Sequence, residues 1–265
     1  MLITDKFVML NFPKTGSSFA RNTLKLLHQP GRLRRACERR GLVAPALQEL
    51  LMKPYFFTVQ HAATGRLHSE HGVYHQIPGP HRAKSLFTVV RDPLQRLVSL
   101  YEFRSWAKYP VPDREQVARW YPQFPDLSFE DFFRLNQELI LPFIQPPGMQ
   151  IRVGPLTTQF IRFYAHNPLK TILSLREGTD LQKDYDLHFP RIRFLHTENL
   201  NQEMHDLLLQ FGYPARKIKF ILDKERMNTT ARSRSTYWTP ELVNAIHENE
   251  RFFFQLFPEY LNDGA

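Results

Sequence analysis

A lysine, a glycine and two serines stand together near the start of the chain, in the turn PKTGSS at residues 13–18. The apolar run 7–12 before this turn has the composition of a buried strand, and residues 17–28 after it place apolar side chains at helical spacing. A turn from a strand into a helix presents backbone N–H groups and the positive end of the helix dipole to an anion. The sequence therefore predicts an anion-binding loop, with a capped helix and a solvated Lys14 as the alternative interpretation.

This loop differs from the Walker phosphate loop of nucleotide hydrolases and kinases. That motif reads G-x-x-x-x-G-K-[ST], with the lysine directly after the last glycine and a hydroxyl residue for magnesium. Here Lys14 precedes Gly16, and no glycine stands before it in the loop. A small-molecule kinase of the P-loop type is therefore disfavoured, and it is kept as an alternative function.

A second candidate anion contact follows the apolar run 86–90. Arg91 closes this run, and Asp92-Pro93 after it is typical of a helix start, with Asp as N-cap and Pro at the first helical position. Ligands of open α/β sheets bind at the carboxyl ends of the strands, and a guanidinium donates to a phosphate in a fork. Arg91 is thus interpreted either as a phosphate ligand or as a structural residue at a helix start.

Strand-like and helix-like segments alternate along the rest of the chain. The predicted strands are 7–12, 55–60, 86–90 and 192–196. Helices are predicted at 17–28, at 45–52, from 92 onward, and at 128–141, 156–165, 201–211 and 239–257, and residues 109–125 are predicted to be irregular. This alternation predicts an α/β fold. We expect a single P-loop-like domain over residues 1–265, with a central, mainly parallel sheet of about five strands flanked by helices.

The two motifs together resemble those of the PAPS-dependent sulfotransferase family, where PAPS is 3′-phosphoadenosine 5′-phosphosulfate. Residues 12–18 resemble the family's 5′-phosphosulfate loop, and residues 90–101 resemble its 3′-phosphate motif. The resemblance implies a sulfotransferase that takes PAPS as its co-substrate, with Lys14 on the sulfuryl donor. The donor contacts that it implies are Lys14, Thr15, Gly16, Ser17, Ser18, Phe19, Arg91, Ser99 and Arg232.

The chain looks closest to the carbohydrate branch of this family, whose loop often reads Pro-Lys-Thr-Gly. Weaker likenesses lie at residues 194–200 and 228–241. The N-terminal membrane anchor of Golgi members is absent from the sequence, so the resemblance is to a bacterial-type soluble form. The Arg-Lys-Gly triplet of the cytosolic small-molecule branch is also absent, and Arg232 in an Arg-Ser-Arg run is the expected substitute. The implied acceptor is a hydroxyl or an amine, with a carbohydrate as one candidate.

Sulfuryl transfer also needs a group that takes the proton of the acceptor. The reaction is an in-line displacement in which charge builds on the leaving phosphate oxygen, where Lys14 is expected to act. His61 follows the predicted strand 55–60, so we expect it at the same sheet edge as Lys14 and assign it as the general base. A structural or solvated His61 is the alternative, because the next loop holds four more histidines, at 68, 71, 75 and 81. Glu70 and Glu102 are reserve candidates.

The charge of the chain is strongly basic, with 35 Lys and Arg against 26 Asp and Glu, a net charge of +9 and a pI of about 9.7. Such a charge favours anionic partners without choosing among them. A basic nucleic-acid-binding protein is a further alternative, but no groove-entering helix or set of stacking aromatics supports it, so no nucleic acid is expected as a partner. The arginines at 32–40 are interpreted as a solvated surface or as a dock for an acidic acceptor.

Cysteine content and hydropathy predict where the protein works. The single Cys37 has no partner for an intramolecular disulfide, which favours a reducing compartment. The sequence has no run of about 18 apolar residues for a transmembrane segment, and its first residues are too charged for a signal peptide. A cytoplasmic location is therefore predicted. His, Asp and Glu do not fall at metal-ligand spacings, so no metal is expected. The oligomeric state is not predicted.

Overall fold

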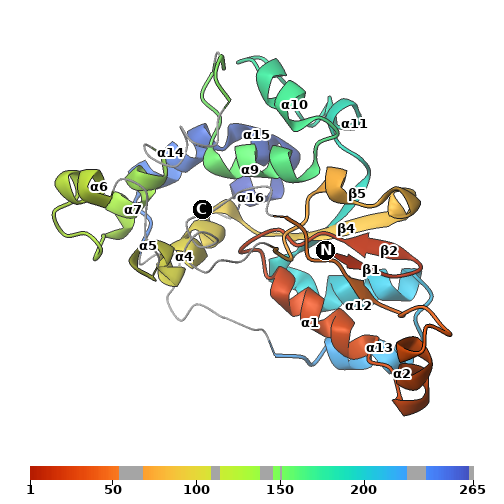
Figure 1. Ribbon diagram of the computed structural model, residues 1–265. Coiled ribbons are helices and arrows are strands. Elements are labelled where there is room, and N and C mark those ends of the chain that lie inside the picture. Colours follow the sequence, from red (N-terminus) through yellow and green to blue (C-terminus); the bar gives the residue numbers. More distant parts are fainter. Residues whose placement is uncertain (54–67, 109–113, 138–145, 150, 226–236, 263–265) are drawn as a thin grey trace. The chain divides into compact units, whose positions relative to one another are not determined.

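The computed structural model describes residues 1–53, 68–108, 114–137, 146–149, 151–225 and 237–262 (Figure 1). The chain divides into two compact units, each of which is described by itself. The first comprises Met1–Tyr55, His68–Arg91 and Arg191–Thr229, and the second comprises Phe56–Leu67, Asp92–Pro190 and Thr230–Ala265. The single domain over residues 1–265 stays a prediction.

A mixed sheet in the order β3-β1-β2-β4-β5 forms the centre of the first unit. Its strands are β1 (Leu2–Ile3), β2 (Phe7–Met9), β3 (Gln48–Glu49), β4 (Ser85–Val90) and β5 (Ile192–His196). The strands β2, β4 and β5 run parallel, with Val8 opposite Leu86 and Val90 opposite His196. The strand β1 pairs antiparallel with both β2 and β3. The predicted α/β fold with a mainly parallel sheet is confirmed for this core of three strands.

The residues between β2 and β4 carry one predicted strand and one predicted helix. The predicted strand 55–60 lies outside the described residues. The predicted helix 45–52 is wrong, because its middle forms β3, which pairs with β1 through Glu49 opposite Leu2. Local helical preference is weak over so short a segment, and the hydrogen bonds offered by the open edge of β1 override it.

Helices of the first unit cover one face of the sheet (Figure 1). The covering helices are α1 (Ser17–Leu27), α12 (Leu200–Gln210) and α13 (Ala215–Ile218). The unit also has α2 (Arg32–Arg39) and the 3₁₀ turns η1 (Tyr74–Gln76), η2 (Gly79–His81), η4 (Thr197–Asn199) and η5 (Lys219–Ile221). Alternate strand residues such as Phe7, Met9 and Phe87 pack against Leu24 of α1 and Leu208 of α12 in one buried core. The predicted helices 17–28 and 201–211 are thus present. By contrast, α2 buries none of its residues.

The second unit is helical in its described part. Its helices are α4 (Pro93–Phe103), α5 (Ser105–Lys108), α6 (Arg114–Trp120), α7 (Phe129–Leu135), α9 (Pro155–Tyr164), α10 (Pro168–Ser174), α11 (Tyr185–His188), α14 (Pro240–Asn249), α15 (Arg251–Leu256) and α16 (Glu259–Asn262). The predicted cap of the helix at 128 is confirmed, since Ser128 Oγ accepts a hydrogen bond from the Asp131 N–H at 3.1 Å. The single predicted helix 239–257 is wrong, because it breaks at Glu250 into α14 and α15.

An aromatic cluster holds part of the second unit together. Trp106 stacks on Tyr101 with ring centroids 5.7 Å apart and lies 4.6 Å from Phe132. Val117 of α6 is buried in the same cluster. The prediction that residues 109–125 are irregular is therefore wrong over α6, because burial of this valine stabilises a helix within a proline-rich stretch. No helix among the described residues is long and apolar enough to cross a membrane.

Candidate active site

The loop between β2 and α1 has a backbone conformation that residues other than glycine rarely adopt. Lys14 has φ of 65° and Gly16, the N-cap of α1, has φ of 77°, both in the left-handed region. The left-handed conformation costs a non-glycine residue about 1 kcal/mol or more, and such strain is common at ligand sites. The helix has no side-chain cap and no acidic residue in its first turn. This loop is therefore shaped to present peptide N–H groups rather than to close the helix end with a side chain of its own.

The hydroxyl groups of the loop are divided between the interior and the surface. Thr15 Oγ1 and Ser17 Oγ both donate to the carbonyl oxygen of Phe12, at 2.9 and 2.8 Å, and both residues are buried. Ser18 is exposed. Phe19 packs in the sheet core, and its N–H bonds the Gly16 carbonyl at 2.9 Å. The hydroxyl groups of Thr15 and Ser17 thus stabilise the loop from within, whereas Ser18 lies on the solvent-exposed side of the loop.

Arg91 lies at the end of the strand next to this loop. The strand β2 pairs in parallel with β4, and two further contacts extend this pairing beyond Met9. The Leu10 N–H donates to the Phe87 carbonyl at 3.0 Å, and Thr88 Oγ1 donates to the Leu10 carbonyl at 2.9 Å. The structure therefore brings the Lys14 loop and Arg91 to the same carboxyl edge of the sheet, as the sequence predicts.

The residues that follow Arg91 in the resemblance to the 3′-phosphate motif form the start of α4 and contact other parts of the second unit. Asp92 Oδ1 accepts from the Leu94 N–H at 2.9 Å, which confirms the predicted N-cap of α4. Arg96 is buried and donates to Gln159 of α9. Ser99 lies on α4 and is half-buried. Arg91 belongs to the first unit and Ser99 to the second, so each is described within its own unit, and their joint contact with a phosphate stays a prediction.

Two sequence-predicted site residues, His61 and Arg232, lie outside the described residues. Another histidine of the first unit contacts the loop before Lys14. His71 Nδ1 lies 2.9 Å from the carbonyl oxygen of Asn11, so a neutral His71 carries its proton on Nδ1 and its lone pair on Nε2. Asn11 itself is buried, and its Oδ1 has no hydrogen-bond partner among the described residues. The sequence names His71 only as one of four crowded histidines, because no local signal separates it from the others.

The two reserve carboxylates are held by other side chains. Glu70 lies 3.9 Å from the guanidinium of Arg21. Burial raises the pKa of Glu70, but hydrogen bonding from its own backbone and the charges of His71 and Arg21 outweigh burial and lower this pKa below its ordinary value. Glu102, in the second unit, accepts a hydrogen bond from the Tyr237 hydroxyl. A lowered pKa makes Glu70 a weaker base than an ordinary glutamate.

One residue that the sequence does not single out joins the predicted site residues. The hydroxyl of Thr197, at the start of η4, lies 2.6 Å from the Thr15 carbonyl oxygen and 2.7 Å from that of Val90. Its sequence signals are its place directly after the predicted strand 192–196 and the weak family likeness at residues 194–200, neither of which assigns it a role. A threonine there carries no pattern of its own, and its partners are 182 and 107 residues away.

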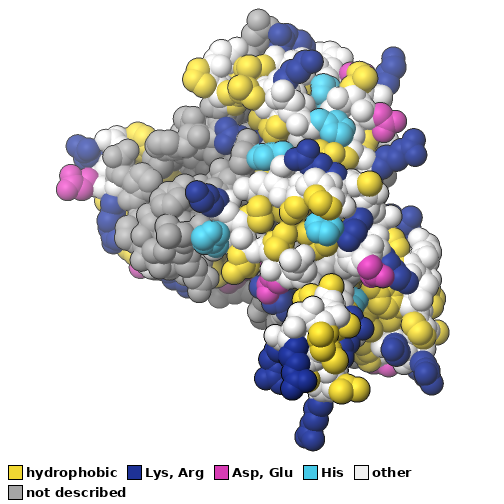
Figure 2. Space-filling view, turned by 45° about the vertical axis from the view of Figure 1, so that its right-hand side comes forward, with side chains coloured by type: hydrophobic (Ala, Val, Ile, Leu, Met, Phe, Trp, Pro, Cys, Tyr) yellow, Lys and Arg dark blue, Asp and Glu magenta, His cyan; other side chains and the backbone are white. Residues whose placement is uncertain are grey.

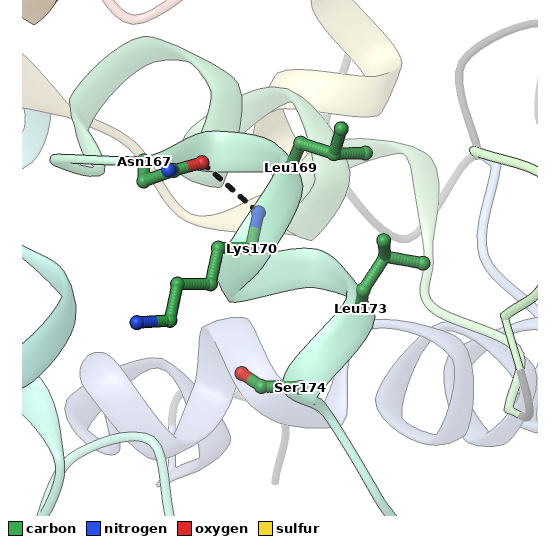
Figure 3. A pocket seen from close by; sticks show the side chains of 5 residues that line it. All are labelled: Asn167, Leu169, Lys170, Leu173 and Ser174. Carbon is green, nitrogen blue, oxygen red and sulfur yellow. Dashed lines mark hydrogen bonds between the residues drawn. The ribbon is translucent and has the colours of Figure 1, made fainter.

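Each unit has one notable hollow among its described residues, and neither is lined by Lys14, Arg91 or Thr197. A hollow of about 320 Å³ in the first unit is lined by Glu198, Asn199, Asn201, Gln202, Leu222 and Lys224. The second unit has an open hollow of about 450 Å³ along α10, where Leu169 and Leu173 project on one side and Lys170 and Ser174 on the other (Figure 3). No residue of the predicted site lines the α10 hollow. Lys and Arg side chains outnumber acidic ones on the face drawn in Figure 2, which favours anionic ligands.

A model of the sulfotransferase family matches residues 2–260, nearly the whole chain. The chain belongs to the sulfotransferase family. None of the curated proteins compared with this sulfotransferase matches it. A similar solved structure is a mouse sulfotransferase complexed with PAP, with 11% identity and a TM-score of 0.41 over 98% of this chain and 86% of that chain. So low a similarity decides nothing about the site, and the family match is what decides against the kinase and nucleic-acid alternatives.

Proposed function

We propose that this sulfotransferase takes the sulfuryl group from PAPS and that the edge formed by the ends of β2 and β4 binds this donor. The observation that carries the proposal is the parallel pairing of β2 with β4, which places Lys14 and Arg91 after adjacent strands. Two cations at one sheet edge, one of them within an N–H-rich loop at a helix start, suit a ligand with two separate anionic groups.

In this proposal the loop holds the 5′ end of the donor. Backbone N–H groups of Thr15, Gly16 and Ser17 and the hydroxyl of Ser18 face the phosphosulfate, while Phe19 anchors the helix in the core. Arg91 binds the 3′-phosphate in a fork, with Ser99 and Arg232 as the further contacts that the family resemblance implies. The Asn11 carboxamide, whose buried oxygen has no partner among the described residues, lies just before this loop.

The chemistry is an in-line displacement at sulfur. An acceptor oxygen or nitrogen forms a bond to sulfur while the bond from sulfur to the phosphate oxygen breaks, and adenosine 3′,5′-bisphosphate leaves. Negative charge grows on the leaving oxygen, where the ammonium of Lys14 stabilises it in the transition state. The acceptor proton goes to a base. No step of this proposal uses a metal ion.

Two histidines compete for the role of base. His61 is proposed because it follows a predicted strand, and His71 because its Nδ1 hydrogen bond to the Asn11 carbonyl fixes the ring beside the loop. If a neutral imidazole accepts the proton, turnover falls below a pH of about 6–7. Replacing the base by Asn should lower turnover by about 10²–10⁴-fold, whereas the other histidine tolerates this change. Turnover against pH for His61→Asn and His71→Asn separates the two.

The acceptor is proposed to be a hydroxyl or an amine, with carbohydrates to be tried first, and the reaction is placed in the cytoplasm because the chain has a single cysteine. The test is thermal unfolding with adenosine 3′,5′-bisphosphate, with ATP and Mg²⁺, and with an oligonucleotide, followed by a screen of glycans, phenols, lipids and peptides with labelled PAPS. The bisphosphate at 100 times its Kd should stabilise the fold by about 2.7 kcal/mol. Stabilisation by ATP and Mg²⁺ alone would contradict the proposal.

A further inference from the structure

The hydroxyl of Thr197 joins the two segments that carry the cations of the proposed donor site. One of its partners is the carbonyl of Thr15, directly after Lys14, at 2.6 Å. The other is the carbonyl of Val90, directly before Arg91, at 2.7 Å. A hydroxyl has one proton, so the two carbonyl oxygens share it in a three-centre hydrogen bond. One oxygen atom therefore bridges the peptide of the Lys14 loop and the peptide at the end of β4.

The segment that holds Thr197 is itself anchored. His196, the preceding residue, pairs opposite Val90 in the sheet, and its N–H donates to Glu203 Oε2 of α12 at 2.7 Å. Leu200, three residues on, is buried in the core against α1. Thr197 thus stands on a strand end and a helix start that are both fixed, so its hydroxyl is a rigid spacer rather than a mobile surface group.

The methyl group of Thr197 meets the same loop from the side. A Cβ placed on Gly16 would lie 3.2 Å from Thr197 Cγ2 and 3.6 Å from its Oγ1. A side chain at residue 16 would therefore press on the Thr197 methyl group, and a glycine avoids this crowding.

We propose that Thr197 is a positioning residue that fixes the distance between Lys14 and Arg91, so that one ligand with two anionic groups meets both cations at once. The inference rests on the proposed function, because it takes the donor nucleotide as that ligand. Losing the hydroxyl removes the link between the Thr15 and Val90 carbonyls, so the separation of Lys14 and Arg91 is less narrowly fixed beyond the paired strands. A ligand with a single anionic group needs only the loop and is little affected, whereas a ligand that spans both segments loses the gain of simultaneous contact.

The test is calorimetric titration of Thr197→Val and Thr197→Ser with adenosine 3′,5′-bisphosphate and adenosine 5′-monophosphate. Valine keeps the shape without the hydroxyl, and serine keeps the hydroxyl without the methyl group. In Thr197→Val we expect the preference for the bisphosphate to shrink at least about fivefold, the scale of one lost hydrogen bond. In Thr197→Ser the preference stays within about twofold of the wild type, because the spacer oxygen remains.

If the valine variant does not fold, Thr197→Ala replaces it, since the smaller side chain leaves room for a water molecule at the two carbonyls. We expect the preference for the bisphosphate to shrink in this variant as well. A merely structural Thr197 would lower the unfolding temperature and weaken both nucleotides equally, and that result overturns the inference. A wild-type protein that shows no preference for the bisphosphate overturns the proposed donor site and with it this inference. A wild-type preference that Thr197→Val leaves unchanged overturns the inference alone.

Discussion

The helices α9 and α1 of this sulfotransferase each begin at a glycine N-cap without a side-chain cap, and their first turns are completed in opposite ways. At α9 the N-cap is Gly154, and the carboxylate of Glu250 accepts from the Leu156 and Thr157 N–H groups at 2.9 and 2.8 Å. At α1 the N-cap is Gly16, with Lys14 beside it and no acidic residue in the first turn. The chain supplies its own anion to the end of α9, and in our account it prepares the end of α1 for an anion that arrives with the substrate.

The difference also concerns packing. A Cβ on Gly154 would lie 2.3 Å from Glu250 Cδ, so the carboxylate fills the space at that helix end. Glu250 is buried, and Thr157 Oγ1 donates a further hydrogen bond to it at 2.8 Å. At α1 the side chain packed against the glycine is Thr197, whose methyl and hydroxyl groups are neutral. A buried end needs an internal anion for stability, whereas a ligand site keeps its N–H groups for the ligand.

The largest effect is expected from Lys14→Ala. Turnover should fall by about 10²–10³-fold, because the ammonium acts on charge that grows only in the transition state. Binding of adenosine 3′,5′-bisphosphate should weaken only modestly, since backbone N–H groups hold the 5′-phosphate in the proposed site. Lys183→Ala, which removes an exposed lysine of the second unit, is the matched control. Near-normal turnover of Lys14→Ala would remove this lysine from the mechanism.

The next effect is on stability, at the other helix end. Glu250→Ala leaves the N–H groups of Leu156 and Thr157 without their acceptor, and we expect a loss of about 3 kcal/mol in the free energy of unfolding. Glu248→Ala, which removes an exposed carboxylate near the end of α14, should change this free energy by less than about 0.5 kcal/mol. Urea unfolding of both variants measures the contrast. Equal midpoints would show that Glu250 does not hold the start of α9.

The two helix starts differ in how well the sequence predicts them, because their contacts join residues at very different separations along the chain. The loop at α1 is local: the strand, Gly16 and the helix stripe lie within about twenty residues, so pattern and composition reveal it. The contact of Glu250 with Thr157 spans 93 residues, and those of Thr197 with Thr15 and Val90 span 182 and 107. A side chain that acts across such separations carries no periodic or motif signal, so only the fold brings it to its partners.

A smaller loss of stability is expected from Gly16→Ala, and comparison with Gly41→Ala separates crowding by Thr197 from backbone strain. Gly16 and Gly41 have nearly the same φ, 77° and 69°, but a Cβ on Gly41 would meet no atom within 4 Å. Gly41→Ala should cost about 1 kcal/mol from its conformation alone. Gly16→Ala should cost about 1 kcal/mol more, because its methyl group would press on Thr197, and it should also weaken bisphosphate binding. Equal losses in the two variants would show that Thr197 does not confine the loop.

The smallest expected effect is a dependence on pH. Burial raises the pKa of Glu250 above its ordinary value, against the lowering effect of its hydrogen bonds from Leu156 and Thr157 and of the charge of Arg96. A carboxyl whose pKa is raised in the folded state contributes stability below its unfolded pKa and loses it as the pH rises through the folded pKa. The free energy of unfolding of the wild type minus that of Glu250→Gln should therefore fall as the pH rises from about 4. A difference that grows with pH would mean a lowered pKa.

The ends of β2 and β4 are proposed to hold one nucleotide between Lys14 and Arg91. The most direct test of this proposal is calorimetric titration of wild type and Arg91→Ala with adenosine 3′,5′-bisphosphate and adenosine 5′-monophosphate. The account predicts that the wild type prefers the bisphosphate by roughly 10–100-fold, the scale of a charge-assisted contact of about 1.5–3 kcal/mol, and that Arg91→Ala loses most of this preference. Equal weakening of both nucleotides by Arg91→Ala would contradict the account and leave Arg91 as a structural residue at the start of α4.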